Sequence, residues 1–76
     1  MMQPYKNVGG NSGVRAYEIG ADSITVQFTE GATYLYTYGS AGSDAIERMK
    51  TLAAAGSGLN SYISRTVKKG YARKLS

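Results

Sequence analysis

The sequence contains no cysteine, no histidine and no tryptophan among its 76 residues, and only one proline. Without cysteine no disulfide can form, and without cysteine and histidine the usual ligands of a structural zinc ion are missing. A chain of this length buries only about 60% of the surface that its unfolded form exposes. Its stability must therefore come from packing within one small domain, helped by any self-association.

The same absences argue against an enzyme. Acid–base and nucleophilic catalysis most often use histidine, cysteine or a carboxylate set beside a partner. Of the five acidic residues, Asp22 and Glu30 fall at opposite ends of one expected strand, and Asp44 and Glu47 suit the start of a helix. The glycine-bearing stretch 9–13 lacks the lysine and the strand–loop–helix setting of a phosphate loop. We therefore expect a non-enzymatic protein with no cofactor and no metal.

Long apolar runs are missing as well. Residues 1–13 hold one lysine and no apolar stretch of the length that a signal peptide needs. No later run approaches the roughly 20 apolar residues that span a bilayer. These features predict a soluble, cytoplasmic protein with no membrane partner.

Positive charge is concentrated near the carboxyl end. Residues 1–64 hold four basic and five acidic side chains, a net charge of 4 − 5 = −1, whereas the whole chain has a formal charge of +4. The excess comes from five residues that follow the last acidic residue: Arg65, Lys68, Lys69, Arg73 and Lys74. Such a segment attracts phosphate groups. A solvated basic tail that only keeps the protein soluble is the competing interpretation.

Two early segments have the composition of antiparallel strands. Residues 14–19 tolerate the β conformation and lead into the turn-forming residues 20–22. Residues 23–29 alternate apolar and polar side chains, as a half-buried strand does. The apolar face of this second strand carries Ile24, Val26 and Phe28.

The third strand carries Tyr34, Tyr36 and Tyr38 at alternate positions, so three rings share one side of the sheet. The preceding loop decides which side. A two-residue loop pairs Val26 with Leu35 and turns the tyrosines to solvent, whereas a three-residue loop with a left-handed glycine turns them to the core. The shorter loop requires a positive φ at a glutamate, where asparagine, aspartate or glycine is preferred. We therefore expect the longer loop and a buried tyrosine stripe.

Two amphipathic segments follow the strands. Asp44 and Glu47 have the spacing of a helix cap, and that helix is expected to stop at Gly56. A second helix is expected over 59–67, closed by Gly70. The order of elements predicts an α+β domain: a three-stranded antiparallel meander packed on two C-terminal helices, with one sheet face open. Residues 1–12 lack periodicity, and they are expected to form a flexible N-terminal arm outside the core.

Short motifs in this order resemble the KTSC domain, a family of small bacterial domains that also occurs at the carboxyl end of some lysyl-tRNA synthetases. The matching positions are Ser12, Ile19 to Asp22, Ile24, Val26, Phe28 to Gly31, Tyr34, Tyr36, Gly56, Leu59, Asn60 and Ile63. The sequence departs from the family pattern at Ala21, Ala54, Leu59, Ser64 and residues 39–42. The resemblance implies one KTSC-like domain over 13–76, with RNA binding as the family's suggested role.

Two functions from different classes are consistent with these features. The first is binding of RNA or single-stranded nucleic acid through Arg65, Lys68, Lys69, Tyr71, Arg73 and Lys74. In this hypothesis Tyr71, and also Tyr17 or Tyr36, stacks on bases. Asn60 suits a base edge, but near a helix start it more often bonds the local backbone. The second function is protein–protein interaction or homodimerisation through the open sheet face or a strand edge.

Overall fold

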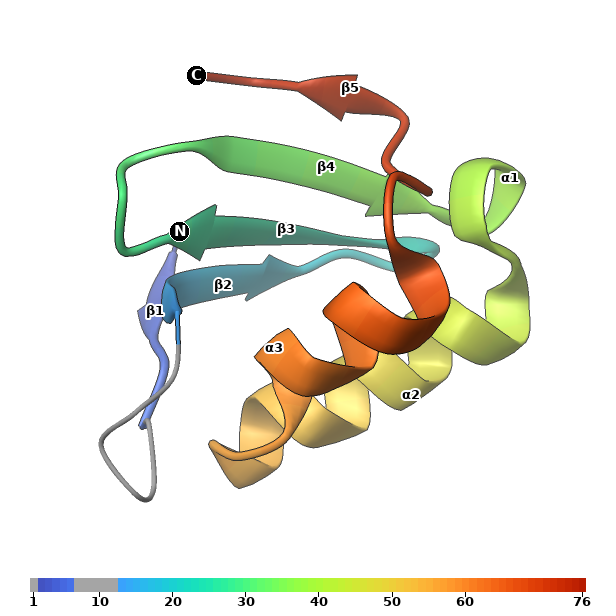
Figure 1. The fold of residues 1–76 in the computed structure, drawn as a ribbon. Coiled ribbons are helices and arrows are strands. Elements are labelled where there is room, and N and C mark those ends of the chain that lie inside the picture. Colours follow the sequence, from blue (N-terminus) through green and yellow to red (C-terminus); the bar gives the residue numbers. More distant parts are fainter. Residues whose placement is uncertain (1, 7–12) are drawn as a thin grey trace.

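The chain forms one antiparallel sheet with helices packed against it (Figure 1). The computed structural model describes residues 2–6 and 13–76. In chain order the elements are β1 (Gln3–Pro4), β2 (Val14–Ile19), β3 (Ser23–Phe28), β4 (Thr33–Thr37), α1 (Tyr38–Ala41), α2 (Ser43–Ala55), α3 (Leu59–Tyr62), the π-helix η1 (Ile63–Val67) and β5 (Arg73–Lys74). The α+β class is confirmed, but the sheet has five strands in the order β1-β2-β3-β4-β5, where three were predicted.

Both extra strands lie at sheet edges. In β1, Gln3 pairs with Tyr17 of β2, and the backbone amide of Tyr5 donates to the carbonyl of Arg15 at 2.9 Å. The Tyr5 side chain is buried in the core, and its hydroxyl accepts from the amide of Leu59. The prediction of an arm outside the core is therefore wrong for Tyr5, whereas Gln3 and Pro4 are exposed residues of an edge strand. Residues 1 and 7–12 of that arm lie outside the described residues.

The predicted register of the tyrosine strand is confirmed. Val26 pairs with Tyr34 and Ile24 with Tyr36. Gly31 has φ 107° and donates its amide to the carbonyl of Phe28 at 2.9 Å. A glycine accepts this positive φ without steric cost, and the three-residue loop follows from it.

The three tyrosines differ in burial. Tyr36 is 2% exposed and belongs to the core, whereas Tyr34 is half-buried beside it. Tyr38 was predicted on the same stripe, and that prediction is wrong: β4 ends at Thr37, and Tyr38 begins α1 with 38% of its surface exposed. The chain turns here because the Thr37 side chain accepts from the amide of Ser40 while the Ser40 hydroxyl accepts from the amide of Thr37, a capping box.

The helix α2 begins without the predicted cap. Gly42 occupies the N-cap position with no side-chain hydrogen bond, so the expected capping by Asp44 and Glu47 is wrong. The predicted stop is confirmed, because Gly56 has the left-handed φ of 77°. The second predicted helix is α3, which continues directly into η1.

One face of the sheet and the helices enclose the core. In Figure 1, α2 and α3 lie together against the sheet. The buried cluster consists of Tyr5, Val14, Tyr17, Ile24, Val26, Tyr36, Ile46, Met49, Ala53, Leu59 and Ile63. The other face carries the cross-strand row Glu18, Thr25, Leu35 and Arg73, over which no described helix lies. Among the described residues, no helix is both long and apolar enough to cross a membrane.

Candidate nucleic-acid interface

The carboxyl-terminal segment is part of the sheet. The amide of Ala72 donates to the carbonyl of Leu35 at 2.6 Å, and the amide of Leu75 donates to that of Thr33 at 2.7 Å. These bonds place β5 on the outer edge of β4, where Figure 1 shows it. The backbone of Arg73 and Lys74 is therefore held along a strand, which sets the side of the sheet from which each side chain projects.

The ring of Tyr71 fastens this segment to the sheet. Its centroid lies 4.5 Å from that of Tyr34 and 6.2 Å from that of Tyr36, and Phe28 meets Tyr34 edge-on at 5.8 Å. Pairs at these separations add to stability beyond the area they bury. The half-buried Tyr71 therefore has a packing role already. Tyr17 is 8% exposed and Tyr36 2%, so their rings offer no accessible face, and their predicted stacking on bases is wrong.

Lys68 and Lys69 form the tip of a tight turn. The amide of Gly70 donates to the carbonyl of Val67 at 2.9 Å, which closes a four-residue β-turn. Lys68 has φ 53° and ψ −117°, close to the ideal first central position of a type II′ turn. Glycine dominates that position, because a side chain there meets the backbone. Lys68 is the only non-glycine residue with positive φ in the described ranges, and both lysine side chains are exposed.

The remaining cations do not form one patch with this turn. Lys74 pairs with Tyr34, so it projects on the same side as the aromatic rings, and its ammonium lies 6.0 Å from the Tyr34 ring centroid. Arg73 pairs with Leu35 and projects from the open face. Arg65 lies on η1, where its Nε donates to the carbonyl of Ser61 at 3.4 Å. The structure thus distributes the predicted basic site over the turn, η1 and both sides of β5.

A shallow hollow lies beside the Tyr34 ring. It is open to solvent, has a volume of about 340 Å³ and is lined by Glu30, Gly31, Ala32, Tyr34, Lys74 and Ser76. The lining thus includes one aromatic, one acidic and one basic residue. Two residues of the predicted site lie here, Lys74 from the basic segment and Tyr34 from the family motif. Asn60, another residue of the family motif, is half-buried on α3, and a Cβ placed on Gly13 would lie 3.4 Å from its amide group.

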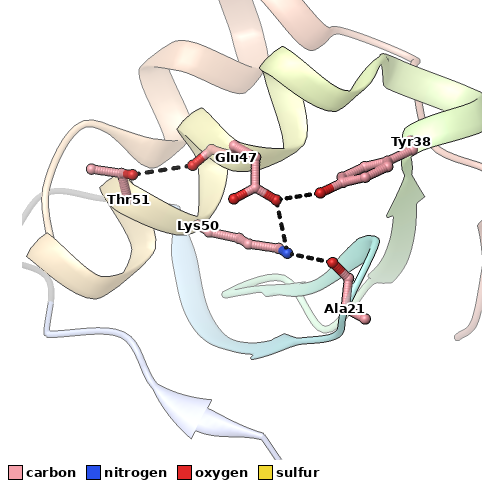
Figure 2. A network of polar contacts seen from close by, with 5 residues as sticks. All are labelled: Ala21, Tyr38, Glu47, Lys50 and Thr51. Atoms are coloured by element: carbon pink, nitrogen blue, oxygen red, sulfur yellow. Dashed lines mark hydrogen bonds and ion pairs between the residues drawn. The ribbon is translucent and has the colours of Figure 1, made fainter.

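A second polar cluster joins α1, α2 and the β2–β3 turn (Figure 2). The Tyr38 hydroxyl donates to Glu47 Oε2 at 2.7 Å, and Lys50 Nζ donates to the same oxygen at 3.0 Å and to the carbonyl of Ala21 at 3.0 Å. The bond from Tyr38 lowers the pKa of Glu47, and Lys50 adds to this effect. The same bond raises the pKa of Tyr38. These shifts favour the ionised carboxylate and the neutral phenol, and the hydrogen bonds connect α1, α2 and the β2–β3 turn at the surface.

Comparison with known proteins finds no matching family model, no matching curated protein and no matching solved structure. The resemblance to the KTSC domain therefore stays an expectation drawn from its motifs. Two surface features of this chain bear on its function, the lysine turn and the hollow beside Tyr34.

Proposed function

We propose that the protein is a small non-enzymatic domain that binds RNA or single-stranded nucleic acid. The phosphates of the nucleic acid contact the basic segment from Arg65 to Lys74. The observation that carries this proposal is the conformation of Lys68. A non-glycine residue held in a glycine-type region costs about 1–3 kcal/mol, and such strain clusters at functional sites. A lysine at the tip of this turn therefore lowers the stability of the fold relative to glycine. Binding of a phosphate by its ammonium group would account for this cost.

The arrangement of the other cations fits a strand of phosphates that passes along the sheet edge. Because β5 is the edge strand, side chains from both of its faces can be reached from outside the sheet. Arg73 and Lys74 therefore both remain available to one ligand, although they project to opposite sides. The turn with Lys68 and Lys69 comes shortly before this edge in the chain, so a single strand that runs along the edge would contact both groups of cations.

The resemblance to the KTSC domain supports the same proposal, since RNA binding is the role suggested for that family. Protein–protein interaction is the weaker alternative. The edges of β2 and β4 are already paired with β1 and β5, and the open face is rich in polar side chains such as Thr25, Gln27 and Thr33.

Salt-dependent binding tests the proposal. A fluorescein-labelled oligoribonucleotide of mixed sequence is titrated with protein, and fluorescence anisotropy is recorded between about 50 and 200 mM salt, the range over which phosphate contacts weaken steeply. For Lys68→Glu/Lys69→Glu we expect at least tenfold weaker binding and a salt slope smaller by about 1.4, since each lost phosphate contact of a single strand contributes roughly 0.7.

The matched control is Arg15→Glu/Arg48→Glu, which makes the same change in net charge at exposed positions on β2 and α2. If both double variants weaken binding equally, only net charge matters and the basic segment is not the site. If the unmodified protein does not bind the oligonucleotide at low salt, the proposed function is wrong.

A further inference from the structure

We propose that the hollow beside Tyr34 is a subsite for one unpaired base that carries an exocyclic amino group, with cytosine as its simplest example. This inference rests on the proposed function and adds a chemical preference to it. Three residues that line the hollow would supply the recognition: Tyr34 through its ring, Glu30 through its carboxylate and Lys74 through its ammonium group.

The Tyr34 ring is held in place by its neighbours. Tyr71 packs against it and Phe28 meets its edge, yet Tyr34 remains half-buried and lines the hollow. A fixed, partly exposed aromatic ring is the usual platform on which proteins stack an unpaired base. A hollow of about 340 Å³ falls at the lower end of the roughly 300–1,000 Å³ range of small-ligand sites, a size that suits one base better than a duplex.

Glu30 and Lys74 give this platform two different polar partners. The Lys74 ammonium lies 6.0 Å from the ring centroid, at the outer limit of about 6 Å for a cation–π contact, so its long exposed side chain is free to turn toward a phosphate. A carboxylate repels a phosphate but accepts a hydrogen bond from an amino group, as Glu does from the N4 amino group of cytosine. The Glu30 carboxylate in this basic region therefore favours contact with the amino group of a base over contact with a phosphate.

Gly31 contributes no side chain to the lining of the hollow, and the space beside it is open. It lines the hollow, and a Cβ added there would meet no heavy atom within 4 Å. A base can therefore approach over the β3–β4 turn without displacing a side chain at this position.

Paired homopolymers test the subsite. Oligocytidylate and oligouridylate of equal length differ at position 4 of the base, an amino group in one and a carbonyl in the other. We expect the unmodified protein to bind oligocytidylate about five- to tenfold more tightly at neutral pH. Glu30→Ala removes the acceptor, so it should bring this ratio close to one and leave the salt slope unchanged, because the phosphate contacts are intact. Tyr34→Leu should weaken both oligomers by about tenfold through lost stacking, whereas Tyr34→Phe should retain the unmodified affinity.

A titration with cytidine monophosphate, followed by amide chemical shifts, locates the contact independently. Shifts at Gly31 and Ala32 are expected, and these also remain informative if Tyr34→Leu does not fold. Salt-dependent binding with no cytosine preference, or with a preference that Glu30→Ala leaves intact, overturns the subsite but not the proposed function. Absence of binding to either oligomer at low salt overturns both.

Discussion

Replacing Lys68 by glycine is expected to stabilise the fold while it weakens nucleic-acid binding. The relief of backbone strain at φ 53° is worth about 1–3 kcal/mol. Glycine lowers the free energy of unfolding by about 0.5–1 kcal/mol, because it has more conformational freedom in the unfolded chain. The net gain is therefore about 1 kcal/mol, which corresponds to a rise in Tm of roughly 4–8 °C for a domain of this size.

Thermal and urea unfolding, followed by circular dichroism, measure this gain. Lys69→Gly is the matched control: it removes the same charge one position later, where φ is not positive. We expect it to be neutral or destabilising. In the same anisotropy assay, Lys68→Gly should reduce the salt slope by about 0.7, the contribution of one phosphate contact. Stability that falls in Lys68→Gly as it does in Lys69→Gly would refute the argument from strain.

Two further predictions concern the fold alone. Burial raises the pKa of Tyr36 to about 12, with Tyr34 and Tyr71 adding to the effect. Because the folded state holds this proton more tightly than the unfolded state, the full contribution to the free energy of unfolding is present below pH 10, and about 3 kcal/mol is lost as the pH rises from about 10 to 12. Urea unfolding across this range should show a smaller loss for Tyr36→Phe. An equal loss in the two proteins would contradict the assignment to Tyr36. Gly56→Ala should cost about 2 kcal/mol or more, since φ is 77° and the added Cβ would lie 2.5 Å from Lys6 Cβ. Gly39→Ala is its control, with its nearest contact at 3.8 Å and no positive φ, and a similar loss at both positions would contradict this reasoning.

The sequence predicted those features that depend on local stereochemistry. The register between β3 and β4 follows from one glycine, because only a residue tolerant of positive φ closes the three-residue loop. The stop of α2 follows from Gly56 for the same reason. The capping role given to Asp44 and Glu47 failed because the helix begins at Ser43 with Gly42 as its N-cap, so both residues lie inside the helix. The Glu47 carboxylate accepts instead from Tyr38 and Lys50.

The two edge strands could not be predicted from pattern. Each is two residues long, too short to show alternation, and each is fixed by one ring, Tyr5 for β1 and Tyr71 for β5. The basic residues of the candidate site were found from charge alone. Their distribution over the turn and the two sides of β5 could not be predicted, because it depends on the pairing of Lys74 with Tyr34. The type II′ turn was missed because a lysine stands where glycine is its usual marker.

β1 and β5 lie on opposite borders of the sheet. These outermost segments of the described chain therefore protect the sheet against aggregation. Deleting either of them would bare the amides and carbonyls of β2 or β4, which other copies could then pair with. Versions of this protein that lack either strand should therefore be treated as prone to self-association. Affinity tags are better joined through spacers that leave Gln3–Pro4 and Arg73–Lys74 free to pair.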